Sequence, residues 1–552
     1  QPDYPWRGRI EAASGESVAA EIAAFLGTAE ASDFVVHPPS SWEAGTVVTA
    51  PGADFRFRRF ILHLAHLAHA AGGVDAFLIG SELRGLTFST PGGGSYPFVD
   101  GLVDLAADVA GVLPSAQISY AADWSEYHSH RPDDGSGDVY FHLDPLWASG
   151  HVDFVAIDNY LPLSDWRDGT DHLDAAVARS PYDLAYLKGN VEGGEYWDWF
   201  YASEADRAAQ VRTPISDVVH GEPWVFRQKA IRDWWGNAHH DRPGGARSGA
   251  ATAWVPGSKP VWFSELGCPA VDRGANQPNV FVSRLSSESF LPHFSTGARD
   301  DYMQRQYLRA MVEWWAANGG AVLSPADIQI WAWDARPYPE FPRATGTWSD
   351  GPDWTLGHWL TGRAGAAPVR EMVRARLIER HGLALADMEL THAHGQADGY
   401  PVAAPITFRQ FLQPLEVGVG VLAREAGGRI SVELRDYRPI AAPLSVDGLV
   451  DTEALFARVR GDLVDAPRRA VLAYRSGSHD YESSAAIATI GAGREDGVAP
   501  AESPLVLDAE RAQAAVTRLL RAASEGREEL SLTVPRSATD LAPGSVVEVS
   551  LG

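Results

Sequence analysis

The sequence predicts an α/β protein: a (β/α)8 barrel-like domain over residues 1–362, incomplete at its N-terminus, followed by an α+β region over residues 363–552. Two observations predict this division. Short apolar runs alternate with helical patterns between about residues 54 and 335, which is typical of parallel βα units. The composition then changes near residues 361–368, after the last tryptophan, where Ala, Val, Arg and Glu become dominant.

The first half contains five strand-like runs separated by segments with helical spacing. The expected strands are Ala76–Ile79, Gln117–Tyr120, Val152–Asp158, Val261–Phe263 and Ile328–Trp333, and the expected helices are Phe55–Ala71, Phe98–Leu113, Leu143–Ala148, Glu222–Trp235 and Asp301–Ala317. A closed barrel needs eight strands. Phe34–Val36 is a candidate for a sixth, and we expect the opening strands upstream, since the chain lacks an initiator Met and reads as an interior segment.

The second half mixes helical and strand-like patterns and contains no cluster of catalytic residue types. The expected helices are Phe408–Leu422 and Asp508–Ala523, and the expected strands are Arg429–Arg435, Ala470–Ala473 paired with Ala485–Ile490, Leu530–Val534 and Ser545–Val549. Strands and helices that do not alternate regularly are typical of an α+β arrangement.

The bulk composition excludes several classes of partner. With 46 basic and 72 acidic residues, the net charge is −26, which argues against binding to nucleic acid or to an anionic membrane surface. No run is long enough for a transmembrane helix, so we expect no membrane insertion. The single cysteine, Cys268, excludes a disulfide within the chain and suggests folding in a reducing cytoplasm. The 19 tryptophans suit either sugar binding or a large core.

Two glutamates carry the strongest chemical signal. Glu82 and Glu265 each lie in a Ser-Glu-Leu run where a predicted strand ends. Glycoside cleavage requires one carboxylic acid to protonate the leaving oxygen and a second carboxylate to attack or to activate water. If Ile328 begins the eighth strand, Glu82 ends the fourth and Glu265 the seventh. That placement is typical of a large clan of retaining glycosidases, in which the strand-four residue is the acid/base and the strand-seven residue the nucleophile.

The residue before the predicted acid/base departs from that clan. Many members carry Asn there, which hydrogen-bonds the 2-hydroxyl of the sugar, whereas this chain carries Ser81. The loss of that contact predicts a changed substrate choice or a lower rate.

Other residues at strand ends are candidates for binding the substrate. A Tyr or Asn after the sixth strand suits orientation of the nucleophile or binding of sugar, and a Trp after the eighth suits the floor of a sugar subsite. The candidates are Tyr120, Trp124, Asp158, Asn159, Tyr160, Trp331, Trp333 and Asp334. Core packing is the alternative for each Trp, and a structural pairing with an Arg is the alternative for Asp158.

We expect no metal and no cofactor. His63, His66 and His69 recur at every third position of one predicted helix. A zinc-binding pair on a helix prefers a spacing of four, and no acidic ligand accompanies these residues.

Six motifs resemble one family, and the longest of them, Lys259–Asn279, extends well beyond what catalysis requires. The runs Tyr4–Ile10, Lys259–Asn279 and Trp331–Pro339 resemble the barrel-like domain of gene transfer agent and phage tail host-specificity proteins. The runs Arg469–Arg475, Pro504–Asp508 and Leu541–Val547 resemble the tail-hub region of the same family. The resemblance spans essentially the whole chain.

The resemblance implies a component of the distal tip of a phage-like tail, assembled in the bacterial cytoplasm. The hub region would assemble with other tail and hub proteins as a homo-oligomer, and the barrel would bind or cut cell-surface polysaccharide or peptidoglycan. The chain is therefore a candidate retaining glycoside hydrolase, and the alternative is a structural, receptor-binding tail protein with a silent barrel. A free-standing secreted glycosidase fits the second half poorly, because that half lacks the exposed aromatic stripes of a sugar-binding module.

Overall fold

A computed structural model gives the fold. It describes residues 5–550 apart from 14, 38–46, 50–53, 170, 361–364, 436–439, 451–454, 463–465, 480, 492–493, 537–540 and 542. Three parts of the sequence predictions lie outside the described residues: Tyr4 of the first motif, Ala542 of the last motif, and the domain boundary between residues 362 and 363. That boundary stays a prediction.

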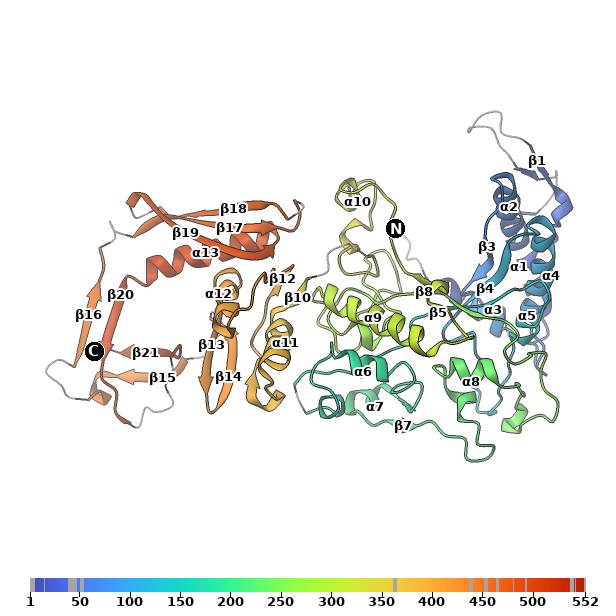
Figure 1. Ribbon diagram of the computed structural model, residues 1–552, viewed down its shortest axis with the longest axis horizontal. Helices are drawn as coiled ribbons and strands as arrows, with labels where there is room; N and C mark the ends of the chain where they lie inside the picture. Colours follow the sequence, from blue (N-terminus) through green and yellow to red (C-terminus); the bar gives the residue numbers. More distant parts are fainter. Residues whose placement is uncertain are drawn as a thin grey trace.

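A five-stranded parallel sheet organises the first half (Figure 1). The strands lie in the order β3-β4-β5-β8-β9, and every neighbouring pair is parallel. Their bounds are β3 Ala76–Ser81, β4 Gln117–Asp123, β5 Val155–Asn159, β8 Val261–Leu266 and β9 Ile328–Ile330. The five predicted strands and their parallel arrangement are confirmed, although β5 begins three residues later than predicted and β9 ends three residues earlier. All five carboxyl ends meet at one edge of the sheet.

The crossover helices surround this sheet, as expected for parallel βα units. They are α2 Phe57–Ala70, α4 Pro97–Val112, α5 Asp144–Trp147, α8 Ile231–Gly236 and α9 Asp301–Asn318, with α1 Val18–Leu26 packed beside α4. The hydrophobic core runs from Val18 to Leu323 and includes both faces of β4 and β5. Among the described residues, no helix is long and apolar enough to cross a bilayer.

Two element predictions in this half are wrong. Phe34–Val36 (β1) does not join the central sheet; it pairs antiparallel with Val47–Thr49 (β2), and Phe34 stacks on His66 of α2 with ring centroids 5.0 Å apart. The predicted helix over 222–235 is two pieces, a 3-10 turn Pro223–Phe226 (η4) and α8. The break lies where the buried Lys229 ammonium donates to two main-chain carbonyls, each at 2.8 Å.

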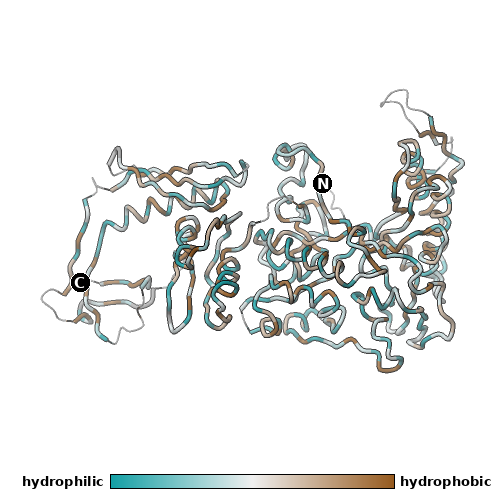
Figure 2. Tube along the Cα trace, in the orientation of Figure 1, coloured by the Kyte–Doolittle hydropathy of each residue, from teal (hydrophilic) through white to brown (hydrophobic). Residues whose placement is uncertain are grey.

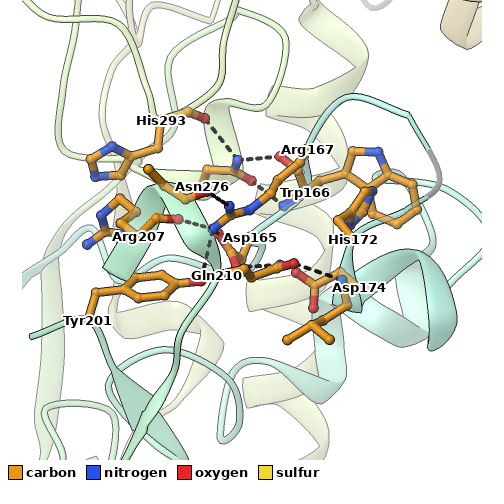
Figure 3. A network of polar contacts seen from close by, with 12 residues as sticks. Asp165, Trp166, Arg167, His172, Asp174, Tyr201, Arg207, Gln210, Asn276 and His293 are labelled. Atoms are coloured by element: carbon orange, nitrogen blue, oxygen red, sulfur yellow. Dashed lines mark hydrogen bonds and ion pairs between the residues drawn. The ribbon is translucent and has the colours of Figure 1, made fainter. Parts of the chain in front are cut away.

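The connection from β5 to β8 is a long excursion of short elements. It holds η3 Leu173–Ala176, α6 Leu184–Gly189, β6 Trp199–Phe200, α7 Glu204–Ala209, β7 Thr213–Pro214, η4, α8 and η5 Pro243–Gly245. A buried network of charged and polar side chains ties these pieces together (Figure 3). Asp165 is its centre, with both carboxylate oxygens bound by arginine, tyrosine or amide donors.

The second half builds its own core from Val369 to Leu520. Three strands in the order β18-β17-β19 pack against α13 (Ala509–Glu525), and their bounds are β17 Pro467–Ser476, β18 Ser483–Thr489 and β19 Arg494–Leu507. The predicted pairing of 470–473 with 485–490 is confirmed, since Ala470 faces Ala488 and Ala473 faces Ala485. Figure 2 shows apolar segments recurring along both halves, which lie end to end (Figure 1).

The remaining elements of this half pair over long distances in sequence. The strand β15 (Ile440–Ser445) lies parallel to β21 (Val546–Ser550), and β16 (Phe456–Arg460) lies antiparallel to β20 (Glu528–Leu532). The helices are α11 Val369–His381 and α12 Phe408–Gly418. The helix predicted to reach Leu422 stops at Gly418, because Gly420 has a φ of 89°, which starts the turn into β13 (Val421–Ala426).

Candidate active site

The two predicted catalytic glutamates converge at the carboxyl edge of the central sheet. Glu82 directly follows β3, and Glu265 is the fifth residue of β8. One carboxylate oxygen from each glutamate and one from Asp158 of β5 all lie within 4.8 Å of one another. Side chains from three strands therefore form one acidic cluster, as parallel strands with a common carboxyl edge allow.

Asp158 links the two Ser-Glu-Leu runs. The Ser264 hydroxyl donates to one of its oxygens at 2.6 Å, and the Ser81 hydroxyl donates to the other at 3.2 Å. Burial, together with the nearby charges of Glu265 and Glu82, raises the pKa of Asp158 well above its ordinary value. Each serine thus anchors the backbone before its glutamate to a shared carboxyl group. The alternative partner for Asp158, an arginine, is absent among the described residues.

Glu265 is held by Tyr160, which leaves β5. The Tyr160 hydroxyl donates to a Glu265 oxygen at 2.5 Å. Burial raises the pKa of Glu265 to about 7; the Tyr160 hydrogen bond opposes the rise, and the negative charge of Glu82 adds to it. The predicted proximity of Tyr160 to the strand-seven glutamate is therefore present in the structure.

Glu82 occupies a constrained position. Its backbone has a φ of 51°, in the left-handed region that non-glycine residues seldom adopt. Its main-chain N–H donates to the Ala121 carbonyl of β4 at 2.8 Å, and the N–H of Leu83 donates to the Tyr120 hydroxyl at 2.7 Å. Such backbone strain costs about 1–3 kcal/mol and persists where surrounding contacts impose it, often at functional sites.

The N-terminal segment covers the Glu82 carboxylate. The Trp6 indole N–H donates to it at 2.7 Å, and the Arg7 guanidinium lies 3.2 Å from the same oxygen. Arg7 also donates to the carbonyl and the hydroxyl of Ser81, both at 2.8 Å. As a result only 8% of Glu82 is exposed.

Gly8 permits this arrangement. The Trp6 side chain folds back over its own segment, and a Cβ at residue 8 would overlap the indole ring. Sequence reasoning used the Trp6–Gly8 run only as a mark of a family. The sequence gives no spacing signal that would connect it with Glu82, 76 residues away.

Two buried carboxyl groups, those of Asp123 and Glu126, lie near Glu82. Glu126 accepts hydrogen bonds from Tyr120 at 2.9 Å and from Thr87 at 2.6 Å. Burial raises the pKa of Glu126 to about 8, and burial with the charge of Glu82 raises the pKa of Asp123 to about 7. Glu126 was not among the predicted residues, since it lies beyond the end of its strand and gives no periodic signal.

The other predicted residues differ in their access to solvent. Tyr120 and Asn159 are buried, and Trp124 is half-buried against Tyr196 with ring centroids 5.2 Å apart. Trp331 and Trp333 are 49% and 77% exposed after β9, which leaves both rings free of the core.

Two polar predictions have clear partners. Asp334 forms an ion pair with Arg336 at 2.7 Å. The Asn159 side-chain oxygen accepts from the Leu161 N–H at 3.1 Å, whereas its buried amide nitrogen has no partner among the described residues. The roles of all these residues in binding substrate stay predictions.

Among the described residues, the acidic cluster is the group whose oxygen atoms lie close enough together to hold a metal ion. Its oxygen-only donors suit a hard cation such as Mg²⁺ or Ca²⁺. Arg7 and the raised pKa of Asp158 and Glu265 already offset the negative charge of the cluster. The expectation of no metal stays a prediction.

Comparison with known families identifies both halves of the chain. Residues 55–342, more than half of the chain, match the family model described as "GTA TIM-barrel-like domain". The chain belongs to this gene transfer agent (GTA) family. Residues 407–552 of this GTA-family protein match a second model, described as "Putative phage tail protein". The resemblance predicted from the motifs is confirmed, and so is the barrel-like fold class.

Two solved structures are similar to parts of the GTA-family chain. A chain titled "Virion of native gene transfer agent (GTA) particle" is 31% identical with a TM-score of 0.33; the match covers 37% of this chain and 46% of that one, so this protein spans less than half of its length. A GH113 β-1,4-mannanase is 15% identical with a TM-score of 0.27, over 60% of this chain and 66% of the mannanase. At these low TM-scores neither likeness determines the activity. No curated protein matches the chain.

Proposed function

We propose that this chain is a tail-tip, host-specificity component of a phage-like particle and that its barrel is a retaining glycoside hydrolase. The substrate class is cell-surface polysaccharide or peptidoglycan. The observation that carries the proposal is the approach of Glu82 and Glu265, whose nearest oxygens lie within 4.8 Å. Retaining enzymes place their two carboxyl groups about 5–5.5 Å apart, whereas inverting enzymes need about 6.5–9.5 Å to admit a water molecule.

We assign one role to each glutamate from the strand that it follows or ends. Glu265 attacks the anomeric carbon while Glu82 protonates the departing oxygen, which gives a covalent glycosyl-enzyme; Glu82 then takes a proton from the water that hydrolyses it. The Tyr160 hydrogen bond orients the Glu265 carboxylate for attack. The exposed faces of Trp331 and Trp333 suit contact with sugar rings.

A silent, glycan-binding barrel is the second candidate, and one observation favours it. Trp6 and Arg7 both contact one oxygen of the Glu82 carboxylate, and their side chains cover it. Only 8% of Glu82 is exposed, so the cover leaves the oxygen of a leaving group little access to this carboxylate. In this alternative the barrel binds glycan without cleaving it.

Product analysis separates the two candidates. Purified protein is incubated with bacterial peptidoglycan and, separately, with envelope polysaccharide, and the new reducing ends are followed by proton NMR from the first minutes. We expect the first product to retain the anomeric configuration of the substrate. An inverted first product would contradict the roles assigned to the glutamates, and glycan binding without any product would support the silent barrel.

The pH dependence of cleavage should follow the ionisation of Glu265. The nucleophile must be ionised, and its pKa is raised to about 7, so kcat/KM should fall about tenfold per pH unit below pH 7. Tyr160→Phe removes a hydrogen bond that stabilises the carboxylate, so the pKa of Glu265 rises further and the acid limb moves to higher pH. An acid limb that stays in place in this variant would show that another group controls it.

We further infer that the second half assembles with other tail and hub proteins as a homo-oligomer, within the bacterial cytoplasm. The match of residues 407–552 to a phage tail family supports this assignment. The acidic net charge of −26 is consistent with protein and glycan partners rather than nucleic acid.

A further inference from the structure

A cavity of about 610 Å³ adjoins the Glu82 side of the candidate site. It begins at Trp6, whose indole N–H contacts the Glu82 carboxylate, and it extends over α3 (Arg84–Phe88), the helix that follows Glu82 in the chain. Ligand pockets commonly measure about 300–1,000 Å³, so this cavity has the size of a binding site. Its lining includes neither Glu265 nor Asp158, which places it on one side of the acidic cluster.

Arg84 is the distinctive residue of this cavity. Its guanidinium stacks over the Phe88 ring at 4.4 Å, and His130 stacks on the same ring at 4.3 Å, so aromatic contacts hold the cation in place. Its Nε is buried and has no hydrogen-bond partner in the described part of the chain. Among the described residues, no carboxylate lies within ion-pair distance of Arg84.

The second arginine in the lining is already occupied. Arg9 pairs with both oxygens of Glu288, one of them at 2.8 Å. Among the described residues that line the cavity, Arg84 is therefore the arginine without an ion-pair partner, since the Glu11 carboxylate in the lining forms no ion pair with it. Guanidinium groups bind carboxylates through paired, charge-assisted hydrogen bonds, which are stronger than hydrogen bonds between neutral groups.

We propose that this cavity is a leaving-group subsite for a carboxylate-bearing sugar, and that Arg84 binds the carboxylate. The position rests on the proposed function, because the leaving group departs on the side of the acid, Glu82. The Trp6 ring offers apolar surface to a sugar, while the Arg84 guanidinium binds its carboxylate. Two sources share this chemistry: the uronic acids of acidic polysaccharides and the lactyl carboxylate of muramic acid in peptidoglycan.

Binding is measured in a Glu265→Gln background, so that cleavage does not interfere. Isothermal titration calorimetry compares two acidic probes, oligogalacturonate and an N-acetylglucosamine–N-acetylmuramic acid oligomer, with their methyl-esterified forms. We expect at least one acidic probe to bind more tightly than its ester, and Arg84→Gln to weaken that binding about tenfold while leaving the ester unchanged. The acidic probe that responds identifies the source.

A matched control separates charge recognition from packing. Arg59 also stacks on a phenylalanine, Phe55, at 3.6 Å, but lines a different cavity, so Arg59→Gln should leave binding unchanged. Arg84→Lys keeps a positive charge and should recover part of the affinity, and a thermal melt shows that each variant is folded.

The outcomes distinguish the subsite from the hydrolase. Equal binding of acid and ester forms, or acid binding that Arg84→Gln does not weaken, would overturn the subsite. Arg84-dependent binding without any cleavage by the wild-type protein would support the subsite and count against the hydrolase. Cleavage of acidic glycan that is insensitive to Arg84→Gln would support the hydrolase and count against the subsite.

Discussion

Replacing Glu265 by glutamine is expected to lower the rate of glycan cleavage by a factor of about 10³ or more. Glutamine has nearly the same shape and can still accept the hydrogen bond from Tyr160, so the site should keep its geometry. The neutral amide cannot attack the anomeric carbon to form a stable glycosyl-enzyme. The loss should therefore appear in kcat, with little change in the affinity for glycan.

Glu82→Gln tests the complementary role. The loss of the acid should cost about 10²–10⁴ in rate on natural glycan, but much less on an aryl glycoside whose leaving group needs no proton. Glu313→Gln is the control, since Glu313 pairs with Arg309 on the exposed side of α9, and its rate should equal that of the wild type. If Glu265→Gln cleaves glycan at the wild-type rate, Glu265 is not the nucleophile.

The sheet and the glutamate pair could be predicted because their signals are local. Each of the five strands is a short apolar run, and parallel neighbours with common carboxyl ends must bring Glu82 and Glu265 to the same edge. Tyr160 followed from the same rule, since it leaves the strand between them. The prediction that Phe34–Val36 belongs to the barrel sheet is wrong because a three-residue apolar run does not specify which strand it pairs with. Here it pairs with Val47–Thr49, the next apolar run along the chain.

The contacts around the two glutamates could not be predicted. They join residues that lie far apart in the sequence, and no periodic pattern in the sequence connects those residues. The serines before the two glutamates meet on Asp158 only after β3, β5 and β8 have assembled. The cover over Glu82 comes from Trp6 and Arg7, which belong to no long helix or strand. Ser81 stands where many members of the glycosidase clan carry Asn. Its hydroxyl hydrogen-bonds Arg7 and Asp158, so it makes contacts within the protein.

The buried network in the β5–β8 excursion is centred on the Asp165 carboxylate. Asp165 accepts hydrogen bonds from Tyr201 at 2.6 Å and Gln210 at 3.0 Å (Figure 3). It also accepts one from Arg212 at 2.9 Å. Arg212 also pairs with Asp174 at 2.9 Å. Burial alone would raise the pKa of Asp165, but the hydrogen bonds from Tyr201, Arg212 and Gln210 outweigh it and lower the pKa. The carboxylate is therefore ionised, and each of its two oxygens accepts at least one hydrogen bond.

Asp165→Ala should reduce the free energy of unfolding by about 3–5 kcal/mol, because it leaves arginine charges buried without their partner. Urea unfolding followed by tryptophan fluorescence measures this change, and Trp199, which lies under the Arg212 guanidinium at 4.1 Å, is well placed to report it. Glu313→Gln removes two exposed ion pairs, with Arg309 and with Lys188, and should change stability by about 1 kcal/mol or less.

The sign of the pH dependence gives an independent check. A carboxyl group with a lowered pKa in the folded state adds stability above its unfolded pKa of about 4, and this contribution is lost as the pH falls through the folded value. The difference between wild type and Asp165→Ala should therefore be largest near pH 7 and shrink below about pH 4. A difference independent of pH would mean that Asp165 stabilises the excursion through packing rather than charge.

This network also bears on catalysis, since the excursion supplies part of the surroundings of the carboxyl edge. Tyr196 from the excursion packs against Trp124, which follows β4, with the two rings tilted by 53°. If charge pairing at Asp165 holds the excursion in place, Asp165→Ala should weaken glycan binding as well as stability, although Asp165 lies outside the acidic cluster. Glu265→Gln should show the reverse pattern, with cleavage lost and stability retained, so the pair of variants separates the scaffold of the site from its chemistry.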